Sequence, residues 1–301
     1  MNDLNRILLR VEKLMDRLEA VLPPAVPEVA WSASVAFRWR KASGQGYLQP
    51  VRHPHGIGLS DLHDIDRQKD LVDANTRQFV EGRPANNVLL TGARGTGKSS
   101  LIKACLNKYA ARGLRLIEVD KADLIDLADI ADLLDGRKER FIIFCDDLSF
   151  EASETAYKAM KAVLDGSVAA PPENLLIYAT SNRRHLMPEY MQENLETKYL
   201  GDEIHPGETV EEKTSLSERF GLWVSFYPFD QDAYLDIVDH WLRTFGQERG
   251  MTDGAREEAL QWALQRGSRS GRVAWQFARD WAGRKARPRV RAGRSDARRK
   301  K

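Results

Sequence analysis

The order of apolar and polar residues along the chain predicts strands that alternate with helices. Short apolar runs, typical of buried strands, occupy residues 87–90, 115–119, 140–147, 175–181 and 222–227, and the third run ends in two acids. Between these runs the apolar residues recur at the spacing typical of helices that bury one face. Uninterrupted apolar strands favour a parallel sheet that is covered on both faces. The pattern therefore predicts an α/β fold with a five-stranded parallel sheet and flanking helices.

The same patterns divide the chain into four parts. An N-terminal segment, 1–58, precedes the α/β core at 59–229. From 230 to 283 the apolar spacing is helical throughout, which predicts a small helical domain whose tryptophans favour core packing over base stacking. The last part, 284–301, is too charged and too poor in large apolar residues to pack, so we expect a disordered basic tail.

Two stretches of the N-terminal segment allow more than one interpretation. Residues 4–22 carry apolar side chains at helical spacing for almost three heptads, which predicts an amphipathic helix. That helix could pack on its own domain or meet a second copy or a partner, and the sequence favours neither. Residues 35–51 are basic and aromatic with a central glycine turn. They predict a hairpin at the edge of the core, and a nucleic-acid contact surface is the less favoured alternative.

Composition and charge limit the cellular compartments and the classes of partner that are compatible with the chain. With 42% hydrophobic and 30% charged residues and no apolar run long enough to span a bilayer, we expect a cytoplasmic globular protein that does not bind membranes. Its two cysteines are expected to be small buried hydrophobes. The tail carries ten Lys and Arg residues, which leaves a net charge of about −7 on the remainder. Residues 183–214 form a polar, largely acidic insertion, which could be a solvated flap or a functional loop.

A glycine-rich stretch follows the first predicted strand and opens a helix, which is the setting of a phosphate-binding loop. Its glycines let backbone N–H groups turn inward, where they and the helix N-terminus attract a polyphosphate. Lys98 would reach the β- and γ-phosphates, and the Ser99 hydroxyl would hold Mg²⁺. The alternative, a glycine turn with a surface lysine, does not account for the flanking strand and helix. The predicted nucleotide-binding residues are Gly92, Ala93, Arg94, Gly95, Thr96, Gly97, Lys98, Ser99 and Ser100.

Polar residues end the third and fourth predicted strands, at the sheet edge where ligands bind in parallel sheets. Asp146 is the expected Mg²⁺ ligand beside Ser99, and Asp147 would orient or deprotonate the attacking water. Asn182 would lie beside this acidic pair and contact the γ-phosphate and the water. The alternatives are a helix cap for the two acids and a turn residue for the asparagine.

Taken together, these motifs resemble the AAA+ ATPase family. The segments PANNVLLTGARGTGKSS, LSERFGLWVSFYPFDQDAYL and RGSRSGRVAWQFARDWAG are similar, more narrowly, to a bacterial AAA+ group called domain of unknown function 815. The resemblance implies that the helical domain is a lid, that Arg219 reaches the nucleotide of a neighbouring subunit, and that Arg272 contacts the phosphates from the lid. The family usually has glutamate where this chain has Asp147, which implies slow hydrolysis or catalysis through a second water.

We therefore expect a Mg²⁺-dependent ATPase that works as a ring-shaped homo-oligomer and remodels or switches a macromolecular partner, such as a protein client. One alternative is a nucleotide-gated binding module with weak hydrolysis. Another is an ATP-dependent nucleic-acid loader that uses the basic tail. A GTPase is disfavoured because residues 180–183 lack a guanine-recognition pattern.

Overall fold

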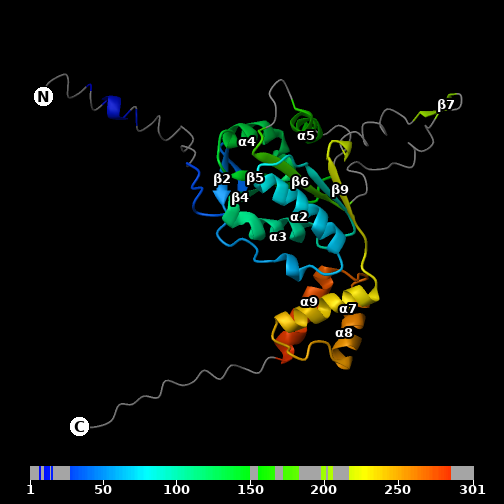
Figure 1. Cartoon of the computed structure of the whole chain (residues 1–301). Coiled ribbons are helices and arrows are strands. Elements are labelled where there is room, and N and C mark those ends of the chain that lie inside the picture. The colour runs from blue at the N-terminus through cyan, green and yellow to red at the C-terminus, as the bar shows by residue number, and fades with distance from the viewer. Residues whose placement is uncertain are drawn as a thin grey trace, which may run out of the picture. The chain divides into compact units, whose positions relative to one another are not determined.

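The computed structural model describes most of the chain, which divides into two compact units, Met1–Tyr227 and Pro228–Lys301 (Figure 1). The predicted boundaries at 58/59, 229/230 and 283/284 remain predictions, and the basic tail lies outside the described residues apart from its first two positions. No helix in the described part of the chain combines the length and the apolar character that a bilayer crossing requires. The described residues are 7, 10–13, 15, 28–149, 155–166, 172–182, 198–200, 203–205 and 217–285.

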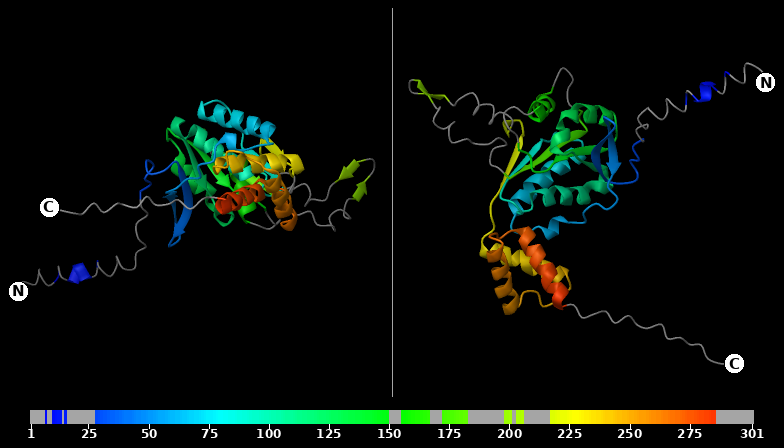
Figure 2. Two further views of the ribbon diagram at one scale, coloured as in Figure 1. Left: turned by 90° about the horizontal axis from the view of Figure 1, so that it is seen from below. Right: turned by 180° about the vertical axis from the view of Figure 1, so that it is seen from behind.

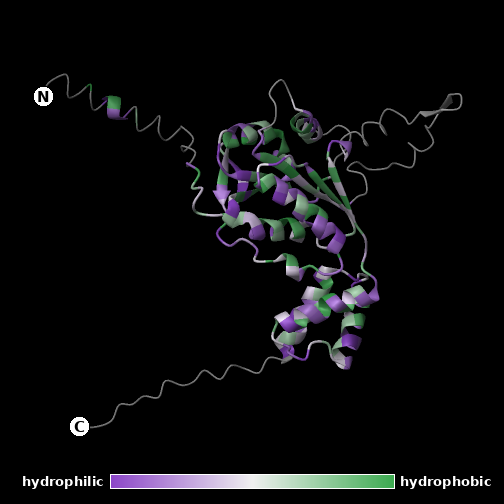
Figure 3. Ribbon diagram, viewed as in Figure 1, coloured by the Kyte–Doolittle hydropathy of each residue, from purple (hydrophilic) through white to green (hydrophobic). Residues whose placement is uncertain are grey.

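The first unit is built on a seven-stranded sheet with the order β2-β1-β4-β5-β6-β3-β9. Apart from the antiparallel pair of β1 and β2, all neighbouring strands are parallel. The central strands are hydrophobic along their length, as a sheet covered on both faces requires (Figure 3). The predicted α/β fold is confirmed, but the predicted number of five strands was wrong. The strands are β1 (Ala36–Ala42), β2 (Gln45–Pro50), β3 (Val88–Gly92), β4 (Leu114–Glu118), β5 (Arg140–Cys145), β6 (Leu175–Ser181) and β9 (Leu222–Phe226).

Helices lie on both faces of this sheet (Figure 2). Successive residues of β6 show which helix lies where, because side chains alternate between the two faces of a strand. Ile177 belongs to the apolar cluster that contains α4 and α5, whereas the Tyr178 hydroxyl contacts Asn75 and Thr76 of α2 at 3.0 and 2.9 Å. The helices are α2 (Asp66–Val80), α3 (Lys98–Tyr109), α4 (Leu127–Leu134) and α5 (Thr155–Asp165), with short 3₁₀ turns at η1 (Leu59–Asp61), η2 (Ala110–Arg112) and η3 (Lys121–Asp126).

The two strands missing from the prediction are the hairpin β1–β2, which extends the sheet beyond β4. The hairpin itself was predicted for 35–51 and is confirmed. Phe37, Trp39 and Leu48 are buried in the same cluster as α4 and α5. The Trp39 Nε1–H donates to Asp126 Oδ2 at 2.8 Å, so η3 is fastened to the hairpin. Apolar side chains on one face of the hairpin explain why it continues the core sheet instead of forming a separate segment.

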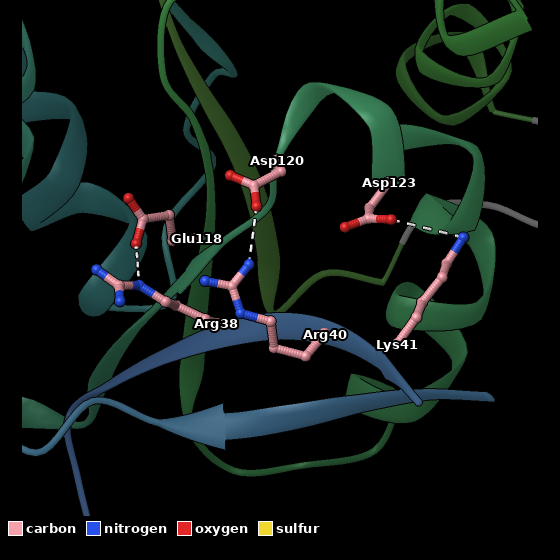
Figure 4. A network of polar contacts seen from close by, with 6 residues as sticks. All are labelled: Arg38, Arg40, Lys41, Glu118, Asp120 and Asp123. Atoms are coloured by element: carbon pink, nitrogen blue, oxygen red, sulfur yellow. Dashed lines mark hydrogen bonds and ion pairs between the residues drawn. The ribbon is translucent and has the colours of Figure 1, made fainter. Parts of the chain in front are cut away.

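The exposed cations of the hairpin pair with carboxylates that lie at and beyond the end of β4 (Figure 4). With its aromatic residues buried and these cations paired, the stretch 37–41 does not present the open basic and aromatic surface that a nucleic acid would need. The nucleic-acid hypothesis therefore rests on the basic tail alone. The pairs join Arg38 to Glu118 at 2.6 Å, Arg40 to Asp120 at 2.8 Å, and Lys41 to Asp123 and Asp126 at 3.6 and 2.8 Å.

The second unit is a three-helix cluster of α7 (Gln231–Thr244), α8 (Asp253–Gln265) and α9 (Gly271–Lys285). Asp230 and Thr252 cap the first two helices by accepting hydrogen bonds from the N–H groups of Ala233 and Ala255. The buried Tyr234 hydroxyl donates to Ala259 O at 3.0 Å and ties α7 to α8.

Two other predicted segments are described only in part. The acidic insertion 183–214 contains a short antiparallel pair, β7 (Lys198–Leu200) and β8 (Glu203–His205), and the rest of it lies outside the described residues. Of the predicted helix at 4–22, residues 7, 10–13 and 15 are described and are helical. The interpretations of 183–214 as a solvated flap or a functional loop, and of 4–22 as a helix that packs on its own domain or meets a partner, stay predictions.

Gly46 is expected to be the position of the hairpin that tolerates substitution least. A Cβ atom there would lie 1.9 Å from Trp39 Cζ2, and that indole is 5% exposed. Gly46→Ala should therefore destabilise the protein by about 1–3 kcal/mol through overpacking, measured by urea unfolding followed by tryptophan fluorescence. Gly56→Ala is the matched control, because a Cβ atom there meets nothing within 4 Å. Equal unfolding midpoints for the two variants would show that the Trp39 packing is not rigid.

Candidate nucleotide-binding site

The glycine-rich loop runs from the end of β3 to the start of α3, and its shape depends on its glycines. Gly92, Gly95 and Gly97 have φ angles of 123, 73 and 97°, a region that favours glycine. At Gly92 a Cβ atom would lie 1.9 Å from the carbonyl oxygen of Phe226, so the close pairing of β3 with β9 also requires glycine. The loop is therefore the glycine-dependent turn between strand and helix that the sequence predicted.

Lys98, the first residue of α3, is buried beneath this loop. Its Nζ donates to the carbonyl oxygens of Gly92 and Ala93 at 2.8 and 2.7 Å and to Asn182 Oδ1 at 3.1 Å. Burial lowers the pKa of Lys98, and the nearby carboxylates of Asp146 and Asp147 oppose that shift. A desolvated cation whose hydrogen-bond acceptors are neutral oxygens is well suited to receive a negatively charged ligand.

Asp146 lies at the end of β5, opposite the start of α3. Its Oδ1 accepts hydrogen bonds from Ser99 Oγ and from Thr180 Oγ1, both at 2.6 Å. A hydroxyl and a carboxylate oxygen this close are the hard oxygen ligands that Mg²⁺ prefers, and Mg²⁺ sites in nucleotide enzymes usually add only waters and phosphates to such a pair. The two residues therefore fit a magnesium ion. In the described part of the chain no group of three His, Cys, Asp or Glu side chains could hold a metal ion.

Asp147 and Asn182 face each other beside this pair. Asn182 Nδ2 donates to Asp147 Oδ1 at 2.5 Å, while the amide oxygen of Asn182 accepts from Lys98. The backbone of Asp147 has φ 52°, a left-handed conformation that is uncommon for a residue other than glycine. One amide side chain thus connects the buried cation with the second acid.

Thr180 is the residue of this network that the sequence analysis missed. It is 1% exposed, donates to Asp146 Oδ1, and accepts the backbone N–H of Asp147 at 3.0 Å. One hydroxyl therefore fixes the carboxylate of the first acid and the backbone of the second. The signal available in the sequence was its place near the end of β6, two residues before Asn182, in register with Leu90 of β3.

A second feature that the sequence did not reveal is an apolar wall beside the loop. A Cβ atom at Gly97 would lie 3.5 Å from Ile65 Cδ1 and 3.8 Å from Leu62 Cδ2, both from the segment before α2. Both side chains are buried, at 7% and 4% exposed for Leu62 and Ile65, so they support the loop from within the core. No local pattern in the sequence indicates this contact, because it joins Gly97 to residues more than 30 positions earlier in the chain.

The structure does not bring every predicted residue into this network. Thr96 Oγ1 donates to Ala93 O at 2.8 Å within the loop, whereas Arg94 is exposed and Ser100 is half-buried on α3. Arg219 pairs with Asp165, the last residue of α5. Arg272 lies in the second unit as an exposed residue in the first turn of α9. The roles predicted for all of these residues stay predictions.

The loop, the buried lysine and the two acids at the carboxyl ends of parallel strands have the arrangement typical of a P-loop on an α/β sheet. The chain belongs to the family described as "Protein of unknown function (DUF815)", whose model matches residues 32–285. The narrower resemblance predicted from the sequence is thereby confirmed. A comparison with curated proteins finds no match.

Solved structures with a similar fold are remote in sequence. The Thermotoga maritima RuvB variant R170A matches at 14% identity and a TM-score of 0.47, over 74% of this chain and 63% of that one. The T. maritima RuvB Holliday junction branch migration motor matches at 14% and 0.46, with the same coverage. The Aeropyrum pernix ORC1 protein in complex with DNA matches at 17% and 0.48, over 75% and 62%. This chain thus spans less than two thirds of each of these chains.

Removing the Thr180 hydroxyl should weaken Mg²⁺-dependent nucleotide binding. Thr180→Val keeps the side-chain shape but leaves Asp146 with one donor fewer and the Asp147 N–H without its acceptor. Loss of such a supporting hydrogen bond typically costs 10- to 100-fold in metal affinity. We expect about a tenfold higher Mg²⁺ requirement in a titration monitored by binding of a fluorescent ATP analogue. Thr180→Ser, which keeps the hydroxyl, should behave like the parent, and a normal Mg²⁺ requirement for the valine variant would contradict the assignment.

Proposed function

We propose that this chain is an AAA+ ATPase that binds Mg²⁺ and ATP and hydrolyses the nucleotide between subunits of a homo-oligomer. The observation that supports it best is the single network that links the buried Lys98 through Asn182 to Asp147. Ser99 and Asp146 lie beside this network as an oxygen pair that fits Mg²⁺. The strand order β4-β5-β6-β3-β9, with the loop after β3 and polar residues ending β5 and β6, supports the same proposal.

In this proposal each residue acts on a different part of the nucleotide. Ser99 and Asp146 would hold Mg²⁺, whose charge would neutralise the phosphates between which the bond breaks. The ammonium of Lys98 exchanges its two carbonyl partners for phosphate oxygens, a more favourable partner for a cation that burial has desolvated. The backbone N–H groups of the loop and the N-terminus of α3 supply further donors.

The attacking water would be held by Asp147 and Asn182. In the structure Asn182 donates a hydrogen bond to Asp147. This hydrogen bond has to open so that the attacking water can bind between the two side chains. Asp147 then accepts a proton from the water and Asn182 orients it against the γ-phosphate.

Arg219 would complete the site of a neighbouring subunit. Its guanidinium pairs with Asp165, and both side chains are partly exposed, at 22% and 40%. A partly exposed ion pair contributes little to stability, so the arginine can exchange Asp165 for a phosphate at modest cost. Arg272, in the lid, is assigned to the phosphates of the nucleotide that its own subunit binds.

Mixing two inactive variants tests whether the site is shared. Arg219→Ala should lower turnover by about 10³-fold with little effect on nucleotide affinity, and Lys98→Ala should lose nucleotide binding. In a one-to-one mixture, about a quarter of the interfaces pair an intact loop with an intact arginine, so ATPase activity should return to roughly that fraction of the parent rate. A mixture as inactive as its components, at concentrations where the parent assembles, would contradict action between subunits.

A nucleotide-gated binding module is the second candidate, and it is favoured by the short acid at position 147 and its direct contact with Asn182. The variant Asp147→Asn distinguishes the ATPase from the nucleotide-gated module. Asparagine has the same size as aspartate and also tolerates a left-handed backbone, so the substitution removes the acid without changing the local structure. If Asp147 is the general base, the parent should hydrolyse ATP about 10²- to 10⁴-fold faster than this variant, with similar ATP affinity. Equal, near-zero rates with tight ATP binding would favour the nucleotide-gated module.

A further inference from the structure

The outward face of η3 and α4 combines exposed apolar side chains with unpaired acids. Ile125 and Leu133 are 50% and 42% exposed, although both belong to elements whose other face lies in the core. Asp129, Asp132 and Asp135 are exposed and have no ion-pair partner among the residues that the structure describes. We call Ile125, Asp129, Asp132, Leu133 and Asp135 the α4 face. A segment that complements the α4 face would carry apolar side chains opposite Ile125 and Leu133 and basic side chains opposite the acids.

The N-terminal segment 4–22 has that chemistry. Ile7, Val11 and Met15 recur every four residues and are helical, yet they are 59%, 51% and 56% exposed. On a helical projection at 100° per residue, Arg6, Arg10 and Arg17 fall along one border of this stripe, and Glu12 and Glu19 along the other. The predicted helix is therefore apolar with one basic border, which matches the α4 face in charge.

The chain also emerges beside this face. Trp31 packs on Phe37 and Phe141 with ring centroids 5.2 and 5.3 Å apart, and the Arg137 guanidinium lies 4.1 Å from its ring centroid. Leu133 precedes Arg137 by four residues, which limits the distance between them to about 14 Å. Val29 and Trp31 both pack against the core, so the chain is held there from residue 28 onward. The five residues 23–27 connect Leu22 to this point and can span about 17 Å. The segment can thus reach the α4 face of its own chain without strain.

We propose that residues 4–22 dock as a helix on the α4 face of the same molecule. Ile7, Val11 and Met15 would cover Ile125 and Leu133, and the border with Arg10 and Arg17 would face Asp129 and Asp132. Burial of these apolar side chains drives the contact, and the charges fix its orientation. Docking within one chain has the advantage that the short connection keeps the local concentration of the segment high. The inference does not depend on ATP hydrolysis.

Thiol cross-linking in the full-length protein tests the orientation. The native Cys105 and Cys145 are buried, and burial raises the pKa of each thiol to about 12, so they stay unreactive. Leu133→Cys combined with Val11→Cys or Met15→Cys should react with a short bismaleimide to give an intramolecular link, identified by peptide mass spectrometry. The control pair is Leu133→Cys with Asp16→Cys, because position 16 lies on the opposite side of the helix. We expect it to react at least about fivefold less.

Charge exchange supplies the second readout. In the Val11→Cys/Leu133→Cys background, Asp129→Arg with Asp132→Arg should lower the linked fraction by about fivefold, since two attractive pairs become repulsive. Adding Arg10→Glu with Arg17→Glu should restore it. Equal reaction of the control pair, absence of a link, or failure of the charge exchange to restore the link would overturn the proposal. A covalent dimer in place of the intramolecular link would assign the segment to a second copy and overturn it as well.

Discussion

The site is organised around a buried ammonium group. Lys98 has lost most of its hydration, and in return it holds two loop carbonyls and the amide of Asn182. A buried cation is costly unless its hydrogen bonds are satisfied, so the loop has to curl over Lys98, and the end of β6 has to bring Asn182 to it. The glycine conformations of the loop and the parallel pairing of β3 with β6 meet this requirement.

The charged residues of the hairpin, at the β2 edge of the sheet, are likewise satisfied by partners from other segments of the chain. In the sequence, 37–41 is a basic and aromatic stretch, yet its aromatic rings are buried and its cations pair with acids at and beyond the end of β4. Basic residues in a strand are therefore no guide to a binding surface until their partners across the sheet are known. Asp129 and Asp132 of α4 differ from these cations, because they are exposed and have no ion-pair partner among the residues that the structure describes.

The parts of the fold that local sequence determines were predicted closely. The strand at 175–181 has the predicted bounds, because a continuous apolar run leaves little freedom. The seven-stranded sheet was missed because the pairing of Phe37 with Ile117 joins residues far apart in the chain. Thr180 escaped for a related reason, since its importance lies in reaching Asp146 and Asp147 across the sheet. The sequence likewise contains no sign that Arg219 meets Asp165 in a single chain.

The left-handed backbone at residue 147 offers a physical reason for aspartate where the resemblance leads one to expect glutamate. Aspartate and asparagine enter this region several times more readily than other side chains, because a short polar side chain can hydrogen-bond locally. Here Thr180 of β6 accepts the N–H of Asp147, and Asn182, which directly follows β6, donates to the carboxylate of Asp147 at 2.5 Å. These two groups fix both the backbone and the side chain of Asp147. A glutamate in the same conformation would carry its carboxylate past Asn182. The shorter acid therefore fits the backbone conformation at this strand end. Its carboxylate reaches less far than that of a glutamate, so a water molecule between Asp147 and the phosphate would have to bridge the remaining distance.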